Sequence, residues 1–372
     1  YANDNIMLYV SGRLANARQE YDEFLAPDDD TLVQRQRTWR AAVGGEATSD
    51  HTRLTFDAAR SDVRRGYAPS DDRYAGVSDF LALRATADVL EPVVQRQAFD
   101  RATLTAGVDA TRNSADIASS FSVYEASDRL VGAYLQGLAG GDSWEASLTG
   151  RRDRHSREGQ TGTWRAGGAL FPIEQLRLHG SAATAFRAPS LFELYDPTYG
   201  NADLAAQRSR SYDLGVGTRV DREFTADVTA FRTDYREGIG YDPLTFVSAN
   251  TGGYRLEGVE SGLGWNPAGD GARLSASWTM QRSDATGDQR VPFLPSQKML
   301  LQPGWDLADW WATVRVEGSG RRSGAGQEMP GYALLGVAAG WHLEVRCGVA
   351  FPQAHAAIPV LLVPTPVARR GG

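Results

Sequence analysis

The chain has 372 residues, of which 23% are charged, with a formal net charge of −7 and a single cysteine, Cys347. The acidic balance argues against a nucleic-acid partner, because no basic stripe is available to neutralise phosphates. One cysteine excludes an intramolecular disulfide and a cysteine-rich metal site. The length itself fits two ordinary domains or one all-β barrel.

No stretch approaches the roughly 18 consecutive apolar residues that indicate a transmembrane helix. A membrane barrel stays compatible with the sequence, since a barrel strand needs apolar side chains on only one of its two faces. The first residues, YANDNIMLYV, show no basic region followed by an apolar core, so no signal peptide is predicted there. Either a signal was removed or the chain begins inside a longer protein.

Apolar and polar side chains alternate with a period of two along much of the chain. The alternation is clearest in residues 102–110, 144–149, 223–230, 272–281 and 310–317. A period of two is typical of β-strands rather than of helices. We expect about sixteen strands and no helix, with the strands near residues 3–13, 32–43, 51–62, 76–90, 99–112, 125–138, 143–155, 161–171, 175–187, 208–220, 223–236, 253–266, 271–283, 297–306, 310–321 and 331–342.

These expected strands exceed the roughly 5–6 residues usual in globular proteins and reach the roughly 9–11 residues that span a bilayer. The connectors between them alternate in length. Short ones lie at 139–142, 172–174, 221–222, 267–270 and 307–309; longer ones lie at 14–31, 63–75, 188–207, 237–252, 284–294 and 322–330. Short turns at one end and long loops at the other indicate a transmembrane antiparallel up-and-down β-barrel.

Aromatic residues gather toward the expected strand ends, where amphipathic rings would lie in the two headgroup zones of a membrane. The alternative is that these rings cap the core of a soluble β protein. The residues are Trp39, Phe99, Trp144, Trp164, Phe171, Phe186, Trp265, Trp305, Trp310 and Tyr332.

The segment from Thr184 to Tyr212 reads as a strand, a polar and aromatic excursion and a return strand, because Pro189 cannot donate to a sheet ladder. It resembles the late-barrel signature of TonB-dependent outer-membrane receptors, which reads roughly FRAPsLxELY and then GNPxLxPExS. The matching residues are Phe186, Arg187, Ala188, Pro189, Leu191, Glu193, Leu194 and Tyr195, followed by Gly200, Asn201, Asp203, Leu204 and Ser209. The second half departs from the family pattern at Ala202, Ala206 and Gln207.

Four weaker segments resemble the same family in the same order along the chain. They are Gly150–Asp153, Leu104–Asp109, Gly253–Glu260 and Pro330–Leu335. Together the matches cover about residues 100–340, and the cobalamin-transporter branch is the most similar. The resemblance implies a 22-stranded barrel with a plug domain, of which this chain would hold about sixteen strands.

We therefore expect residues 1–342 to form part of a receptor barrel that lacks the plug and the last strands. The proline-rich tail, residues 343–372, is expected to form no ladder strand and to reflect a frameshift or a fragment boundary. Resequencing the locus would restore the missing strands in another frame if a frameshift is responsible.

The best candidates for substrate contact are loop side chains that offer ring faces and hydrogen-bonding edges. They are Tyr195, Asp196, Tyr199, Asn201, Asp203 and Tyr241. Their structural alternative is a folded turn in which the tyrosines seal the barrel mouth.

No catalytic or metal site is expected. The five histidines show no ligand spacing, and no G-x-S-x-G nucleophile elbow occurs. The family resemblance implies calcium binding through loop aspartates, for which Asp28, Asp29 and Asp30 are candidates. The alternative for this acidic run is a solvated loop.

The resemblance implies an outer-membrane receptor that captures a corrinoid or a ferric siderophore at its extracellular loops. Import would be coupled to the TonB complex through the plug, and the remaining partner would be the outer-membrane lipid. The alternatives are a passive porin-like channel and a secreted soluble β protein. A porin would show a closing strand and a constriction loop, neither of which the sequence indicates.

Overall fold

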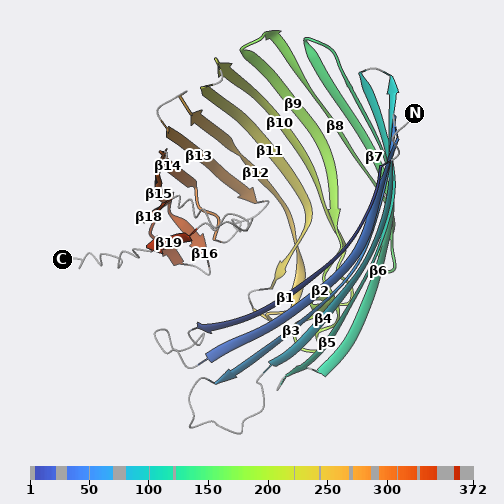
Figure 1. Cartoon of the computed structure of the whole chain (residues 1–372). Coiled ribbons are helices and arrows are strands. Elements are labelled where there is room, and N and C mark those ends of the chain that lie inside the picture. The colour runs from blue at the N-terminus through green and yellow to red at the C-terminus, as the bar shows by residue number, and fades with distance from the viewer. Residues whose placement is uncertain are drawn as a thin grey trace, which may run out of the picture.

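The computed structural model describes residues 5–21, 32–49, 51–69, 81–99, 101–119, 123–221, 223–242, 244–267, 271–285, 293–307, 309–324, 327–341 and 356–360. Nearly all of them lie in antiparallel strands (Figure 1). The elements are β1 (Asn5–Tyr21), β2 (Leu32–Ser49), β3 (Thr52–Pro69), β4 (Leu81–Phe99), β5 (Ala102–Ser119), β6 (Val123–Gly140), β7 (Trp144–His155), β8 (Gly159–Ile173), β9 (Leu176–Arg187), α1 (Leu191–Tyr195), β10 (Gln207–Val220), β11 (Phe224–Tyr241), β12 (Ser248–Trp265), β13 (Ala272–Ala285), β14 (Gln297–Asp306), β15 (Trp310–Ser319), β16 (Arg322–Gly324), β17 (Gln327–Met329), β18 (Tyr332–Trp341) and β19 (Ala356–Val360).

Each long strand pairs with the next one in the chain, from β1 through β15 and on to β18 and β19, while β16 and β17 form a separate hairpin. The sheet curves around a hollow, as Figure 1 shows. Among the described residues no pairing joins β1 to β18 or β19, so the wall does not close. The predicted all-β, up-and-down barrel of about sixteen strands, incomplete relative to a closed barrel, is confirmed.

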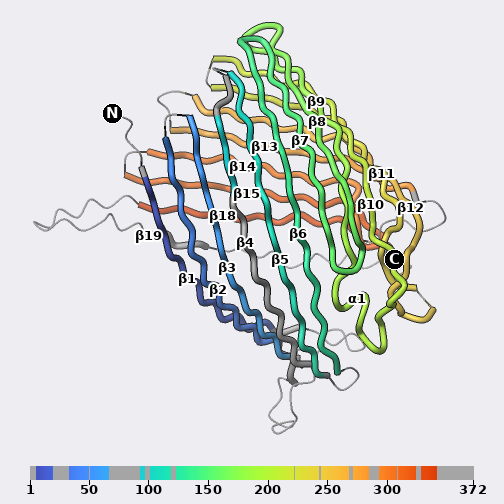
Figure 2. Tube along the Cα trace, turned by 90° about the vertical axis from the view of Figure 1, so that its right-hand side faces the viewer, coloured from blue at the N-terminus to red at the C-terminus, as the bar shows by residue number. Residues whose placement is uncertain are grey.

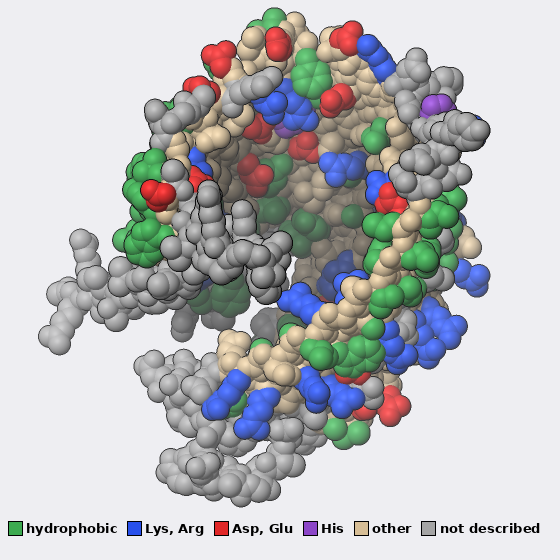
Figure 3. Space-filling view, viewed as in Figure 1, with side chains coloured by type: hydrophobic (Ala, Val, Ile, Leu, Met, Phe, Trp, Pro, Cys, Tyr) green, Lys and Arg blue, Asp and Glu red, His purple; other side chains and the backbone are tan. Residues whose placement is uncertain are grey.

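The alternation of side chains shows which face of the sheet points outward and which lines the hollow. Leu148 on β7 and Leu214 on β10 are 63% and 72% exposed, whereas Asp153 on β7 is 3% exposed. Large apolar groups thus point away from the hollow, and polar groups line it (Figure 3). This inversion of a soluble core is stable only where lipid covers the outer face.

Several strands extend further than the apolar alternation predicts. β1 continues to Tyr21, through the first eight residues of the predicted 14–31 loop, and β11 and β12 reduce the predicted 237–252 loop to residues 242–247. The added residues are mostly polar or small, so they do not continue the apolar alternation. In these extensions the strands pair through backbone hydrogen bonds, and such pairing does not require alternating apolar side chains that could be recognised in the sequence.

The connector lengths follow the predicted rule with two exceptions. Turns such as 50–51, 174–175 and 221–223 are short at one end of the wall, and connectors such as 188–206 and 286–296 are long at the other. At this second end the connectors 120–122 and 156–158 are short. Figure 2 shows α1 at the same end, beside β6.

Two sequence expectations are wrong. A helix, α1, is present between β9 and β10, although its five residues are too few to leave a helical period. The proline-rich tail does supply a ladder strand, because β19 pairs with β18 and places Pro359 opposite Ala338. A proline is tolerated there because β19 is an edge strand. No helix in the described part of the chain is long and apolar enough to cross a membrane.

Aromatic rings mark the short-turn end of the outer face. Trp144, Trp265, Trp305 and Trp310 each lie within a residue of a strand end there and are each 40–42% exposed. This placement fits the expected interfacial girdle.

If one face of the wall meets lipid, a charged side chain should destabilise the protein more on that face than on the lumen face. Leu148→Arg would place a cation in hydrocarbon near the middle of β7 and should lower the free energy of unfolding in lipid vesicles by about 2–4 kcal/mol. The control is Thr149→Arg, one residue along on the lumen face, which should change it by less than about 1 kcal/mol. Urea titrations of both variants measure the difference; equal costs would contradict the assignment.

Candidate functional site

The segment that carries the family signature forms a folded clamp at the long-loop end. β9 ends at Arg187, and Pro189 turns the chain into α1. Ser190 caps the helix: its hydroxyl accepts from the Glu193 N–H at 3.2 Å, and Glu193 Oε2 accepts from the Ser190 N–H at 2.7 Å. This reciprocal pair is a capping box, and its Ser-x-x-Glu spacing is the sequence signal that would have predicted the helix.

Arg187 holds the same glutamate from the barrel side. Its Nη1 lies 3.1 Å from Glu193 Oε2, and its Nη2 donates to Oε1 at 3.2 Å. Burial opposes the charge on Glu193, but the hydrogen bonds from Arg187 and Ser190 outweigh it and lower the pKa of Glu193 below 4.5. The signature residues Arg187 and Glu193 therefore tie the helix to the end of β9.

A small apolar core supports the clamp. Leu191, Leu194, Leu204 and Ala206 are each no more than 9% exposed, and Pro189 is fully buried. Gly200 is required for close packing, since a Cβ there would lie 2.5 Å from the Asp196 carbonyl oxygen. Most of the signature is thus used to shape this loop.

The clamp reaches across the barrel mouth in both directions. Helix α1 contacts β6, and the Ala202 carbonyl accepts from Arg157 in the 156–158 turn. On the other side Asn250 of β12 exchanges two hydrogen bonds with the backbone of Ala205, at 2.9 and 3.0 Å. The 188–206 loop therefore covers strand ends at the mouth near the short connectors 120–122 and 156–158.

The predicted substrate residues divide into two groups. Asp196 is 5% exposed, and its Oδ1 accepts from the backbone N–H groups of Thr198 and Tyr199 at 2.9 and 2.8 Å. Asn201 Oδ1 likewise accepts from the Asp203 N–H at 2.8 Å. These two side chains hold the turn, and both stay predicted ligand contacts.

The tyrosines of the predicted set are displayed to solvent at the same end of the barrel. Tyr195 and Tyr199 are 40% and 37% exposed on the clamp, and Tyr241, at the end of β11, is 53% exposed. Asp203 is also exposed. They stay predicted ligand contacts.

The sequence did not predict one aromatic pair at the mouth of the barrel. Tyr235 of β11 and Tyr254 of β12 lie directly opposite each other on the lumen face, with ring centroids 4.3 Å apart and an interplanar angle of 15°. Gln207 donates to the Tyr254 hydroxyl at 3.4 Å. Only the cross-strand register brings these rings together, since they are nineteen positions apart in sequence.

The lumen wall carries side-chain pairs that step over an intervening strand. Arg151 of β7 bonds Asp153 on its own strand and reaches Asp109 of β5 at 2.5 and 3.0 Å. Gly132 of β6 lies between them, and a Cβ there would collide with the Arg151 guanidinium. His179 of β9 reaches Asp227 of β11 at 2.9 Å.

The second bridge, like the first, crosses a glycine. A Cβ at Gly215 of β10 would lie 2.5 Å from the His179 ring. The glycines thus permit the lumen charges to be paired across three strands, which keeps polar groups on the wall satisfied.

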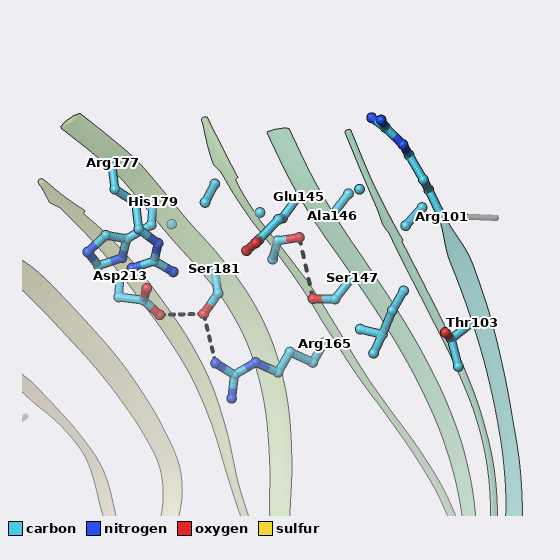
Figure 4. A pocket seen from close by; sticks show the side chains of 17 residues that line it. Arg101, Thr103, Glu145, Ala146, Ser147, Arg165, Arg177, His179, Ser181 and Asp213 are labelled. Atoms are coloured by element: carbon cyan, nitrogen blue, oxygen red, sulfur yellow. Dashed lines mark hydrogen bonds between the residues drawn. The ribbon is translucent and has the colours of Figure 1, made fainter. Parts of the chain in front are cut away.

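A lumen-facing hollow of about 490 Å³ lies between β5 and β10 toward the short-turn end. Figure 4 shows Arg165, Ser181 and Asp213 converging across β8, β9 and β10, with Arg165 3.4 Å from the Ser181 hydroxyl, which in turn donates to Asp213. Arg177 and His179 line the same hollow. The hollow offers hydrogen-bonding groups and charged side chains.

No group of three or more metal-ligating side chains is found in the described ranges. The candidate calcium ligands Asp28, Asp29 and Asp30, and Cys347, lie outside those ranges.

The comparisons with known proteins agree with this geometry. Residues 2–350 match the family model described as TonB dependent receptor-like, beta-barrel. The chain belongs to the TonB-dependent receptor family. Its place is accordingly the outer membrane of a Gram-negative bacterium, and the family is one of transport receptors.

Solved structures of the family share the fold at low sequence identity. The siderophore receptor PirA from Acinetobacter baumannii is 16% identical with a TM-score of 0.69, over 91% of this chain and 62% of that one. The FrpB iron transporter from Neisseria meningitidis is 13% identical with a TM-score of 0.72, over 90% and 62%. The ferric yersiniabactin uptake receptor FyuA from Yersinia pestis is 15% identical with a TM-score of 0.69, over 91% and 61%. The chain thus spans about three fifths of these receptors' length.

The clamp of this TonB-dependent receptor barrel should loosen in acid. Because the pKa of Glu193 is lowered on folding, its stabilising contribution is present above pH 4.5 and is lost as the pH falls through the folded-state pKa. Hydrogen exchange of residues 188–206 between pH 7 and pH 3 should show this loss, worth up to about 1 kcal/mol for a half-exposed ion pair.

The matched variant is Glu193→Gln, which keeps the capping hydrogen bonds but removes the charge. It should exchange faster than the parent at pH 7 and equally at pH 3. A parent clamp whose protection does not change over this range, after correction for intrinsic exchange, would contradict the role given to Arg187 and Glu193.

Proposed function

We propose that this chain forms the barrel wall and extracellular loops of a receptor that imports a ferric siderophore. A ferric siderophore is large, polar and scarce, and it presents ring faces and hydrogen-bonding edges. The observation that carries the proposal is the gathering of tyrosines at the long-loop end of the barrel, the extracellular end in this architecture. Tyr195 and Tyr199 stand on the rigid clamp, and the Tyr235–Tyr254 pair faces the lumen beneath.

The relatives' names support the same ligand class, since PirA is a siderophore receptor and FyuA takes up ferric yersiniabactin. Aromatic side chains on a pre-organised loop give contact area at low entropic cost. The runner-up ligand is a corrinoid, which offers a comparable combination of flat and polar surfaces.

In the proposed mechanism the clamp captures the ligand and the lumen conducts it after a plug domain has been displaced through TonB. The polar lumen wall suits this role, because several of its polar and charged side chains already have partners within the wall. Arg151 is satisfied by Asp109 and Asp153, and His179 by Asp227. A ligand passing them would meet a hydrated surface rather than isolated charges that bind it tightly.

The test is ligand binding by the full chain folded in detergent. Quenching of intrinsic fluorescence is titrated with a ferric catecholate, a ferric hydroxamate, a ferric phenolate and a corrinoid. At least one ferric complex should bind saturably, and Tyr195→Ala with Tyr199→Ala should weaken it about tenfold or more, as expected for aromatic anchors.

Tyr212→Ala is the control, because Tyr212 is an exposed tyrosine on the lipid-facing side of β10 and should leave the affinity unchanged. Saturable binding of the corrinoid alone would establish the runner-up ligand. Binding of none of the four by a folded chain would overturn the proposal.

A further inference from the structure

The outer face of β10 to β13 changes character abruptly along the strands. One cross-strand row is wholly apolar and consists of Leu214, Ala230, Val259 and Met280. From this row to the short-turn ends, the outward positions of these four strands carry no charged side chain. This part of the face is the hydrocarbon-facing belt.

The next two rows toward the long-loop end are charged. The first row contains Tyr212, Arg232, Glu257 and Arg282, and the second contains Arg210, Asp234, Arg255 and Asp284. The rise per residue in a strand is about 3.4 Å, so the first charges lie about 7 Å beyond the last apolar row. That distance puts the charges in the headgroup layer of the outer leaflet.

Two carboxylates in these rows are already occupied by arginines. Asp234 accepts from Arg232 Nε at 2.9 Å and from Arg255 Nε at 2.8 Å. Glu257 Oε1 accepts from Arg282 Nε at 2.8 Å. These pairs fix the guanidinium groups of the rows in place.

Three further arginines on this face have no such partner. Arg208 and Arg236 lie directly opposite each other on β10 and β11. Arg210 lies one row below Arg208. All three side chains are exposed and make no hydrogen bond or ion pair with any described residue. Like charges directly opposite each other on one face of a sheet destabilise it unless an anion lies between them.

These side chains border a groove of about 870 Å³ on the outer face. The groove is lined by Arg208, Arg210 and Arg236 together with Asp234 and Asp284, and Tyr212 and Trp164 line its side nearer the belt. Trp164 and Tyr212 are 47% and 48% exposed. The groove therefore has a cationic end and an aromatic end, and it continues into the lipid-facing surface.

We propose that this groove is a binding site for the phosphate-bearing headgroup of an outer-leaflet lipid. Guanidinium groups bind phosphate through paired N–H donors, and Arg208 with Arg236 presents two of them toward one point. The aromatic side chains would pack against the sugar or acyl part of the same lipid, which enters from the adjoining belt. The occupant is an annular lipid and not the transported ligand, since the groove lies outside the wall.

The arginines of this face are not confined to the groove. On the outer positions of the strands before β10, Arg112 of β5, Arg129 of β6 and Arg152 of β7 also lie beyond the apolar belt on the long-loop side. The chain as a whole is acidic, so its overall composition does not explain why arginines outnumber carboxylates on the outer face at this one level of the membrane. Attraction to the phosphates of neighbouring lipid headgroups explains it.

The experiment measures lipid binding by the full chain folded in zwitterionic detergent. Lipid A with both phosphates is compared with the same lipid after removal of the phosphates, and native mass spectrometry or thermophoresis gives the affinities. The phosphorylated form should bind at least about tenfold more tightly, and added salt should weaken it.

The variant is Arg208→Gln with Arg210→Gln and Arg236→Gln, none of which leaves a carboxylate unpaired. It should lose about tenfold in affinity for the phosphorylated lipid and nothing for the dephosphorylated one. The control is Arg177→Gln with Arg219→Gln, which removes arginines from the lumen face of β9 and β10 at the short-turn end and should bind like the parent.

Inorganic phosphate at millimolar concentration separates a lipid site from a free-anion site. If phosphate displaces the lipid completely, or if both lipid forms bind equally, the proposal is overturned. Retention of full affinity by the groove variant would overturn it as well. None of these outcomes depends on which ligand the extracellular loops capture.

Discussion

The fold depends on one requirement, which is that every backbone N–H and C=O within the bilayer finds a partner inside the protein. Antiparallel pairing of consecutive strands meets this requirement between neighbouring strands from β1 to β18, while the outer edge of β1 has no partner strand among the described residues. Once the backbone is satisfied, alternation assigns the side chains, with apolar groups facing lipid and polar groups facing the lumen. The exposed Leu148 and Leu214 are therefore a normal outcome here, although they would be anomalous in a soluble sheet.

A polar lumen creates its own difficulty, because charges on a curved wall must be paired without a packed core. The structure pairs them across three strands by placing a glycine on the middle one. Gly132 lets Arg151 reach Asp109, and Gly215 lets His179 reach Asp227.

The 188–206 segment shows how a family signature can be structural and functional together. Arg187, Ser190 and Glu193 form one hydrogen-bonded unit, and the leucines between them are buried. This order holds the segment that carries Tyr195 and Tyr199 in one folded arrangement at the mouth of the barrel. On the outer wall, the ion-paired rows of Arg232, Asp234 and Arg255 act in a comparable way, because they hold cationic groups at a fixed membrane level.

The sequence by itself determined the class of fold, the number of long strands and the face that meets lipid, because a period of two is a local property that each strand repeats. The signature around Arg187 and Pro189 determined the family. Tertiary structure decided what depends on register and on projection beyond the membrane: the Tyr235–Tyr254 pair, the bridges across glycine, the opposed Arg208 and Arg236, and the strand ends at Tyr21 and Tyr241. Such features join residues on different strands, and the register between strands depends on turn geometry and on the match between whole strands, which the pattern of one strand does not show. The helix α1 was not predicted because five residues are too few to show a helical period, and β19 was not predicted because its proline argued against a ladder strand.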